Sequence, residues 1–194
     1  LGVPGEKELT GMGVSYCATC DGAFFRDQTV AVVGGGNVAL EDALFLARGC
    51  SKVYLIHRRD ELRGEKILQE QVKNTENIEI LYSHQISAIE GNGQVASVKL
   101  YDKKTEQTTD LAVDGVFIAV GIDPNTEIYR GLVDMDDQGF IVAGEDGTTS
   151  SPGLFAAGDL RTKQLRQVIT AAADGANCVT SVERYLVALH AGIQ

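Results

Sequence analysis

The chain has 194 residues, of which 44% are hydrophobic and 23% charged, and its formal net charge is −10 at pH 7. This length allows one large core or two modest domains. The acidic balance argues against nucleic acid as the main partner, and no apolar run reaches the roughly 20 residues of a membrane-spanning helix. We therefore expect a globular protein that binds neither nucleic acid nor a membrane.

Two of the four cysteines, Cys50 and Cys178, stand alone in the sequence. A chain of this size does not need disulfides for stability, so we expect both to be small buried thiols. This cysteine usage favours a reducing, cytoplasmic location. The chain begins at Leu1 rather than at methionine, and we expect it to be a fragment of a longer protein.

The first part of the chain alternates between strand-like and helix-like segments. Short apolar runs predict buried strands, and apolar residues at helical spacing predict the helices between them. The expected order is a strand in 28–36, a helix in 37–49 with Gly49 as its C-cap, a strand at 52–57, a helix at 61–73 and a strand at 77–83. This βαβαβ order predicts a parallel sheet and a Rossmann-like α/β domain.

The pattern changes after residue 83. Residues 84–113 contain strand-like stretches separated by "GNG" and "DKKTE", which predicts an antiparallel meander, and 115–121 reads as one more buried strand. Near residue 122 the composition becomes turn-rich. We therefore predict one domain at 1–121 and a second segment at 122–194, which contains a strand at 149–159 and a long final helix.

That final helix is predicted from apolar residues that recur at steps of three or four. These residues are Leu165, Val168, Ile169, Ala172, Ala176, Val179, Val182, Leu186 and Leu189.

The stretch "GGGNVA" directly follows the first predicted strand and opens the first predicted helix. Gly34 and Gly36 fit the G-x-G-x-x-A form of the dinucleotide fingerprint. Glycines there let the backbone turn sharply and approach a pyrophosphate, which then lies at the helix N-terminus. We predict nucleotide contacts at both glycines and at Asn37 and Val38, and the alternative is a purely structural turn.

The second predicted strand ends in "HRRD", where NAD-specific sites usually carry an acid that binds the ribose. This chain instead has His57, Arg58 and Arg59 there, with Arg63 one turn later. Arginine donates paired hydrogen bonds to phosphate, so the segment predicts a 2′-phosphate and hence NADPH rather than NADH. The alternative is a solvated charged loop.

The stretch "CATCDG" contains Cys17 and Cys20, followed directly by Asp21. A structural zinc site needs four protein ligands, and the sequence has no second Cys-x-x-Cys and no histidines at ligand spacing, so we predict no metal. A thiol pair close in sequence to a nicotinamide site suits two-electron disulfide exchange, with Asp21 as the acid for a leaving thiolate. Hydride does not normally pass from nicotinamide to a disulfide, so we expect a flavin between them.

The second segment contains candidate residues for that flavin. Gly158 and Asp159 end the predicted strand, where glycine allows close approach and the carboxylate can bind a sugar-like hydroxyl. The N-terminus of the final helix, in "RQVITAAADGA", can stabilise negative charge on a reduced ring.

The motifs "CATCDG", "GGGNVALEDAL", "HRRDELRGEKIL", "GLFAAGD" and "RQVITAAADG" together resemble bacterial-type, low-molecular-weight thioredoxin reductases over nearly the whole chain. The resemblance implies thioredoxin-disulfide reductase activity, with electrons passing from NADPH through FAD and the cysteine pair to thioredoxin. It also implies a homodimer and a rotation between domains. In this family the NADPH domain is inserted into a split FAD domain, so residues 122–194 would be the C-terminal part of that FAD domain.

The resemblance also implies roles for single residues. Cys20 would face the flavin, Cys17 would attack the thioredoxin disulfide, and Asp21 would be the acid. Glu41 would help to hold the nucleotide, and Asp159 would bind the ribityl chain. The residues expected near the flavin ring are Arg166, Gln167 and Val168.

The chain departs from this family because the N-terminal FAD half, with its own glycine fingerprint, is absent. We therefore expect the chain alone to bind FAD poorly and not to turn over. One alternative is the flavoprotein reductase of a peroxide-reducing system, which "HRR" disfavours because that family usually takes NADH. A ferredoxin-driven relative is disfavoured by the intact nucleotide motif, and a non-enzymatic NADPH-binding module with a regulatory cysteine pair is the third alternative.

Overall fold

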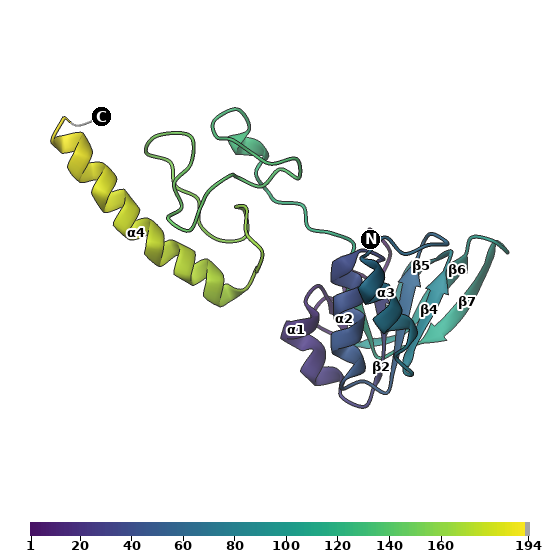
Figure 1. Ribbon diagram of the computed structural model, residues 1–194. Coiled ribbons are helices and arrows are strands. Elements are labelled where there is room, and N and C mark those ends of the chain that lie inside the picture. Colours follow the sequence, from purple (N-terminus) through teal and green to yellow (C-terminus); the bar gives the residue numbers. More distant parts are fainter. Residues whose placement is uncertain (193–194) are drawn as a thin grey trace. The chain divides into compact units, whose positions relative to one another are not determined.

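The computed structural model describes residues 1–192, which form two compact units. The first unit comprises residues 1–121, and the second begins at Ile122 (Figure 1). The fold is α/β, with a parallel sheet and an antiparallel sheet in the first unit, as the sequence predicts. No helix among residues 1–192 is both long enough and apolar enough to cross a membrane.

The parallel sheet has the strand order β1-β8-β2-β3-β4, and every neighbouring pair is parallel. The strands are β1 (Val14–Ser15), β2 (Thr29–Val33), β3 (Lys52–His57), β4 (Ile78–Tyr82) and β8 (Gly115–Ile118). β2 lies at the centre of this order. Because β2 and β3 run in the same direction, the loops that follow them lie at the same edge of the sheet.

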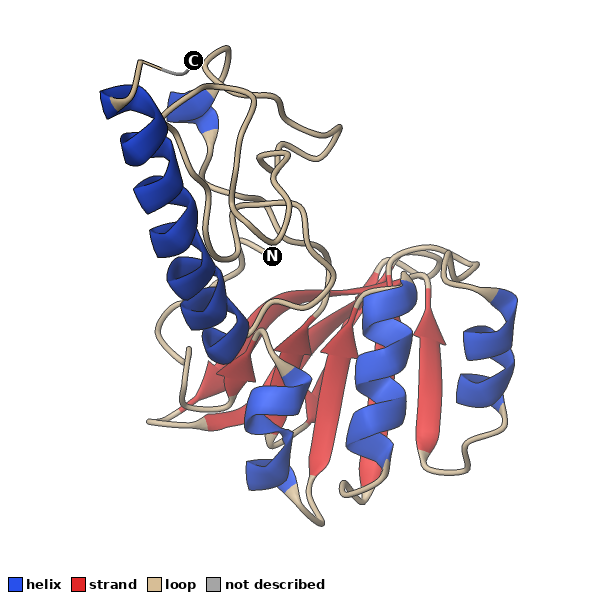
Figure 2. Ribbon diagram, turned by 60° about the vertical axis from the view of Figure 1, so that its left-hand side comes forward, coloured by secondary structure: helices blue, strands red, loops and turns tan. Residues whose placement is uncertain are grey.

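Both faces of the parallel sheet are covered, which explains why β2 is apolar from Val30 to Val33. Val30 and Val32 belong to a core shared with the helices, whereas Ala31 and Val33 belong to a core shared with the antiparallel sheet. The helices lie on one face of the parallel sheet (Figure 2). They are α1 (Ala18–Asp21), α2 (Asn37–Ala47) and α3 (Lys66–Lys73), and a 3-10 turn, η1 (Gly22–Phe25), follows α1.

The antiparallel sheet has the order β5-β6-β7 and covers the other face. Its strands are β5 (His84–Gly91), β6 (Val95–Asp102) and β7 (Gln107–Ala112). Alternate residues such as Ile86, Val98 and Leu100 are buried, as expected for a sheet with one face on a core and the other in water. The predicted meander is therefore confirmed.

The second unit has little regular structure apart from α4 (Val168–His190) and the 3-10 turn η2 (Glu127–Tyr129). Isolated bridges, including Met135–Ile141 and Ile141–Arg161, connect its loops. Its buried apolar cluster is small and consists of Val133, Ile141, Ala143 and Ala156.

Three features of the first unit differ from the prediction. The helix expected at 61–73 begins only at Lys66, because the amides of Arg63 and Gly64 donate to the Gly35 carbonyl oxygen instead of starting a helix. Helix α2 ends with Arg48 as its C-cap, so the prediction of Gly49 at that position is wrong. The short elements β1 and α1 were not predicted, since each has too few residues to show a period.

Two features of the second unit also differ. Residues 149–159 form no strand, and within them only Phe155 takes part in a bridge, with Thr148. Gly153 and Gly158 both have positive φ angles that interrupt an extended strand. Helix α4 begins at Val168, after Leu165, and buries only Asp174 and Cys178 among its residues. The apolar stripe that predicted the helix is therefore mostly exposed rather than buried.

Replacing Phe117 tests the first unit's core, because this side chain is only 1% exposed and packs edge-on against Phe25, with ring centroids 5.2 Å apart. We expect Phe117→Ala to lower the free energy of unfolding of this unit by roughly 3–5 kcal/mol. Hydrogen exchange of the β2 and β8 amides measures that free energy. The control is Phe24→Ala, since Phe24 is 78% exposed, and an equal loss in both variants would contradict the assigned core.

Candidate functional site

The loop between β2 and α2 is shaped by glycines that allow close backbone contact. Gly34 has a φ of +156°, and a Cβ there would overlap the Ala119 carbonyl oxygen. A Cβ at Gly35 would overlap the ring of His57. Gly36 is the N-cap of α2, and no side chain of the described residues caps this helix end. The first amides of α2 are therefore available to an anion, which fits a dinucleotide pyrophosphate.

The turn after β3 places basic side chains next to this loop. Arg58, Arg59 and Arg63 are all exposed. The Arg63 amide donates to the Gly35 carbonyl oxygen at 2.7 Å, and the carbonyl oxygen of Arg59 accepts from the amide of Ser83 at 2.9 Å. These backbone contacts fix the turn beside the loop, so the predicted phosphate ligands are brought to the predicted pyrophosphate site.

The His57 side chain is buried against the loop at Gly35, whereas the arginines that follow it are exposed. It is 4% exposed, and its Nε2 atom has no hydrogen-bond partner among the residues that the structure describes. Burial lowers the pKa of His57, and the positive charges of Arg63 and Arg59 lower it further. The ring is therefore neutral at pH 7, and it packs directly against the Gly35 backbone.

The other predicted nucleotide residues lie on the first turns of α2. Val38 is 61% exposed, and Glu41 is also exposed. The side chain of Asn37 is not free, because it forms hydrogen bonds with Glu65. The next residue after Glu41, Asp42, is partly buried, and this burial together with the negative charge of Glu41 raises the pKa of Asp42 to about 6.

Cys17 and Cys20 form a disulfide at the start of α1. Cys17 is the N-cap of this short helix, and its Sγ accepts a hydrogen bond from the Cys20 amide at 3.2 Å. Cys20 is exposed and Cys17 is half-buried. An N–H group aimed at Sγ stabilises a thiolate on Cys17 once the pair is reduced.

Ser15, which the sequence analysis did not identify, holds the acid beside this pair. It is 5% exposed at the end of β1, and its hydroxyl donates to Asp21 Oδ2 at 2.7 Å. The Ser15 Oγ atom itself accepts a hydrogen bond from the Cys17 amide at 3.1 Å. Because β1 is paired with β8, the sheet edge fixes both the first cysteine and the carboxyl group.

The disulfide turn and the nucleotide loop contact different parts of α2. Gly22, directly after Asp21, lies close to Leu46 and Phe45 near the C-terminal end of this helix. The loop Gly34–Gly36 lies at its N-terminal end. Among residues 1–192 there is also no group of three or more His, Cys, Asp or Glu side chains that could hold a metal ion.

Cys50 and Cys178 are free and buried, so the prediction of two buried thiols is confirmed. Burial raises the pKa of both thiols. A thiol with a raised pKa forms little thiolate, so neither residue is suited to disulfide exchange.

The predicted flavin residues of the second unit lie on the loop before α4 and on its first turn. Asp159 is exposed, and Gly158 has a φ of +86°. Arg166 lies 4.0 Å from the ring centre of Phe140, and its Nε donates to the Asp159 carbonyl oxygen at 3.3 Å. Its guanidinium is therefore already engaged within this loop.

The N-terminus of α4 has a defined cap. Gln167 is the N-cap and forms a reciprocal capping box with Thr170. Val168 and Ile169, the next two residues, are 89% and 78% exposed. This helix end therefore presents an exposed apolar surface.

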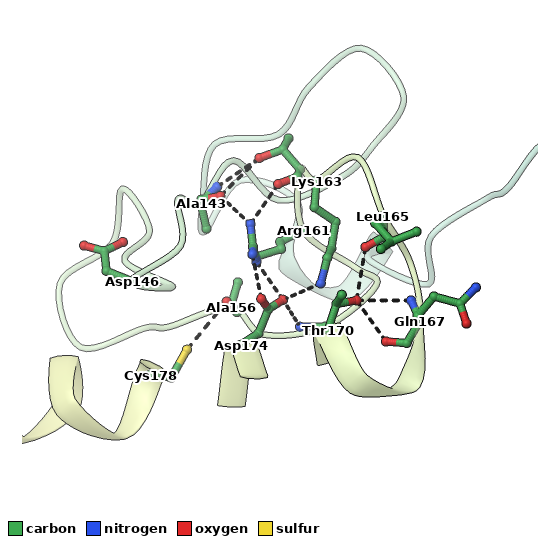
Figure 3. A network of polar contacts seen from close by, with 12 residues as sticks. Ala143, Asp146, Ala156, Arg161, Lys163, Leu165, Gln167, Thr170, Asp174 and Cys178 are labelled. Atoms are coloured by element: carbon green, nitrogen blue, oxygen red, sulfur yellow. Dashed lines mark hydrogen bonds and ion pairs between the residues drawn. The ribbon is translucent and has the colours of Figure 1, made fainter. Parts of the chain in front are cut away.

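A buried ion-pair network ties α4 to the loop (Figure 3). Asp174 is 5% exposed, and its Oδ1 accepts from Arg161 Nη2 at 2.6 Å. Its Oδ2 accepts from Arg161 Nε and Lys163 Nζ, each at 2.8 Å, and from the Gly158 amide at 2.9 Å. Hydrogen bonds from Arg161, and then from Lys163 and Gly158, hold the pKa of this carboxyl well below its usual range. Asp174 was not predicted, since its partners lie in an irregular loop.

The family described as pyridine nucleotide-disulphide oxidoreductase matches residues 1–175. The chain is 51% identical to the thioredoxin reductase of Mycolicibacterium smegmatis, over 96% of this chain and 60% of that relative. It is 46% identical to the bifunctional thioredoxin reductase/thioredoxin of Mycobacterium leprae, over 99% of this chain and 42% of that relative.

The chain is also similar to the solved structure of thioredoxin reductase from Streptococcus pyogenes, with a TM-score of 0.92 and 46% sequence identity. The similarity covers 97% of this chain and 62% of the Streptococcus chain. The chain therefore spans about 60% of the length of the Mycolicibacterium and Streptococcus proteins and 42% of the Mycobacterium protein.

Removing the Asp174 carboxylate leaves Arg161 and Lys163 buried without a counter-ion. We expect Asp174→Ala to lower the free energy of opening of α4 by roughly 3–5 kcal/mol at pH 7. Hydrogen exchange of the α4 amides measures this free energy, and Glu183→Ala, an exposed acid on the same helix, is the control. Because the folded-state pKa of Asp174 is lowered, its contribution is complete above a pH of about 4 and is lost as the pH falls further. A difference between the variants that grew on acidification would contradict this assignment.

The raised pKa of Asp42 predicts the opposite pH dependence. The folded protein binds this proton more tightly than the unfolded chain, so the cost of burying the charged carboxyl appears as the pH rises through about 6. We expect Asp42→Asn to raise the stability of the first unit by about 1–2 kcal/mol at pH 8, after allowance for solvent screening, and to leave it nearly unchanged at pH 4. Thermal unfolding at the two pH values measures the effect, and equal shifts at both would exclude it.

Proposed function

The chain belongs to the pyridine nucleotide-disulphide oxidoreductase family. From this premise we propose that it carries the NADPH-binding site and the redox-active cysteine pair of a thioredoxin-disulfide reductase. One observation carries the proposal: a single compact unit contains both an open dinucleotide loop beside exposed arginines and a cysteine pair with a positioned carboxyl group. The relatives named thioredoxin reductase support it.

In this proposal NADPH binds across the loop after β2. The pyrophosphate lies at the bare N-terminus of α2, where Gly36 adds no side chain and faces open space, while Gly34 lets the loop pack against Ala119. Arg58, Arg59 and Arg63 take the 2′-phosphate, because guanidinium groups bind phosphate oxygens in pairs. The remaining nucleotide contacts are assigned to the first turns of α2, at Asn37, Val38 and Glu41.

A bound FAD would supply the two-electron chemistry that links the nicotinamide hydride to the cysteine pair. The residues of this chain that would hold it are Gly158 and Asp159 on the loop and Gln167 and Val168 at the start of α4. Arg166 would act through its contacts with Phe140 and Asp159 rather than as a free ligand. Since the chain supplies one loop and one helix end, we expect it to hold FAD weakly by itself.

The chain's own chemistry is a dithiol–disulfide exchange. The Cys17 thiolate attacks one sulfur of the thioredoxin disulfide, a mixed disulfide forms, and the other thioredoxin sulfur leaves as a thiolate. Asp21, held by Ser15, supplies a proton to that leaving group. The Cys20 thiolate then attacks Cys17 Sγ, which closes the disulfide seen in the structure and releases the second thioredoxin thiol.

The setting of this reaction is part of the proposal. Thioredoxin as the partner and a homodimeric protein follow from the resemblance, and the names of the relatives support the partner. The free buried thiols Cys50 and Cys178 suit a reducing cytoplasm. The exposed arginines beside the loop favour this reductase over an NADH-linked reductase of a peroxide-reducing system.

A trapping experiment tests the proposed exchange. The chain is reduced with dithiothreitol, desalted and mixed with an excess of oxidised thioredoxin. We expect each chain to reduce one thioredoxin, Cys20→Ser to accumulate a mixed disulfide through Cys17, and Cys17→Ser to accumulate much less. Mass spectrometry of the alkylated mixture separates these products. A pair that stays reduced in the presence of oxidised thioredoxin would favour the regulatory alternative over the reductase.

A further inference from the structure

The basic turn after β3 is attached to the nucleotide loop at more than one point. The amides of Arg63 and Gly64 both donate to the Gly35 carbonyl oxygen, at 2.7 and 3.0 Å. A Cβ at Gly64 would overlap Leu40 Cδ1, so the turn lies directly on the first part of α2. From the other side, Gln69 Nε2 donates to the Gly64 carbonyl oxygen at 2.7 Å. The turn is therefore held between the loop and α3.

A reciprocal pair of hydrogen bonds completes this attachment. Asn37 Nδ2 donates to Glu65 Oε1 at 3.0 Å, and the Glu65 amide donates to Asn37 Oδ1 at 2.8 Å. Asn37 is the first residue of α2, and Glu65 is the N-cap of α3. Both ends of the Asn37 amide group are thus used to join the start of one helix to the start of the other.

The charge of Glu65 makes its location informative. A carboxylate two residues from Arg63 opposes the binding of a phosphate, so electrostatics alone would disfavour an acid there. Its contact with Asn37 offers a positional reason for an acid at this point. When the Glu65 carboxylate is removed, the side-chain amide group of Asn37 loses its acceptor. One of the links between the start of α2 and the basic turn after β3 is then broken.

We propose that Glu65 is a positioning residue that sets the preference for NADPH over NADH. By its hydrogen bond to Asn37, Glu65 keeps the basic turn after β3 close to the N-terminus of α2. One ligand can then reach both the helix end and the guanidinium groups. This inference rests on the proposed nucleotide site. It assigns no direct contact between Glu65 and the ligand.

The experiment is a calorimetric titration of NADPH and of NADH into the chain and its variants. Glu65→Ala removes the acceptor and the charge, whereas Glu65→Gln keeps an acceptor oxygen and removes the charge. We expect Glu65→Ala to weaken NADPH binding about three- to ten-fold and NADH binding less, so that the ratio of the two affinities falls. Glu65→Gln should retain the ratio of the wild-type chain.

Glu61→Ala is the matched control, because Glu61 is an exposed acid on the same turn. Losing its charge should leave NADPH binding equal or slightly tighter. Tighter NADPH binding by Glu65→Ala as well would mean that Glu65 acts only as a charge, and the proposal would be wrong. Thermal unfolding of each variant shows whether it is folded.

Hydrogen exchange provides a measurement that needs no ligand. We expect the Arg63 and Gly64 amides to exchange faster in Glu65→Ala and at the wild-type rate in Glu65→Gln. Unchanged exchange in Glu65→Ala would show that the pair does not hold the turn. If the wild-type chain preferred NADPH and Glu65→Ala kept the full preference, only this inference would fail. If the wild-type chain bound neither nucleotide, the proposed nucleotide site would fail, and this inference with it.

Discussion

Close backbone packing around Gly34, Gly35 and Gly64 is the constraint on which the candidate nucleotide site depends. Side chains at these positions would overlap the Ala119 carbonyl oxygen, the His57 ring and Leu40. Their absence lets the loop after β2, the turn after β3 and the first turn of α2 lie directly against one another. The bare helix end and the neighbouring arginines, which the proposed phosphate binding needs together, both follow from this contact.

The same helix separates the two chemical features of the first unit. The nucleotide loop lies at the N-terminal end of α2, whereas the turn after the cysteine pair packs toward its C-terminal end. An α-helix rises about 1.5 Å per residue, so the length of α2 separates these two contacts. At the C-terminal side, the Ser15 hydroxyl holds the Asp21 carboxyl group beside the cysteine pair.

Sequence patterns predicted the elements whose signal is local. Apolar runs identified four of the five parallel strands, β2, β3, β4 and β8, since both faces of that sheet are buried, and "GNG" identified the turn of the meander. The prediction was wrong where a distant contact overrides the local pattern, as at residues 61–65, whose backbone bonds to Gly35 and Asn37. Glu65 and Asp174 lie within quoted motifs, but those motifs assigned them no role. Their roles, like that of Ser15, come from hydrogen bonds across the fold.

Helix α4 shows most clearly why periodicity alone can mislead. Its apolar stripe predicted a helix, and the helix is present, but its buried residues are Asp174 and Cys178 rather than that stripe. Apolar burial is non-directional. The hydrogen bonds that the Asp174 carboxylate accepts from Gly158 and Arg161, by contrast, fix both the rotation of α4 and the path of the loop. The loop that carries Asp159 is thus set by directional bonds to a charge. Such bonds suit the role proposed for Asp159, which needs its carboxylate at a fixed distance from the helix end.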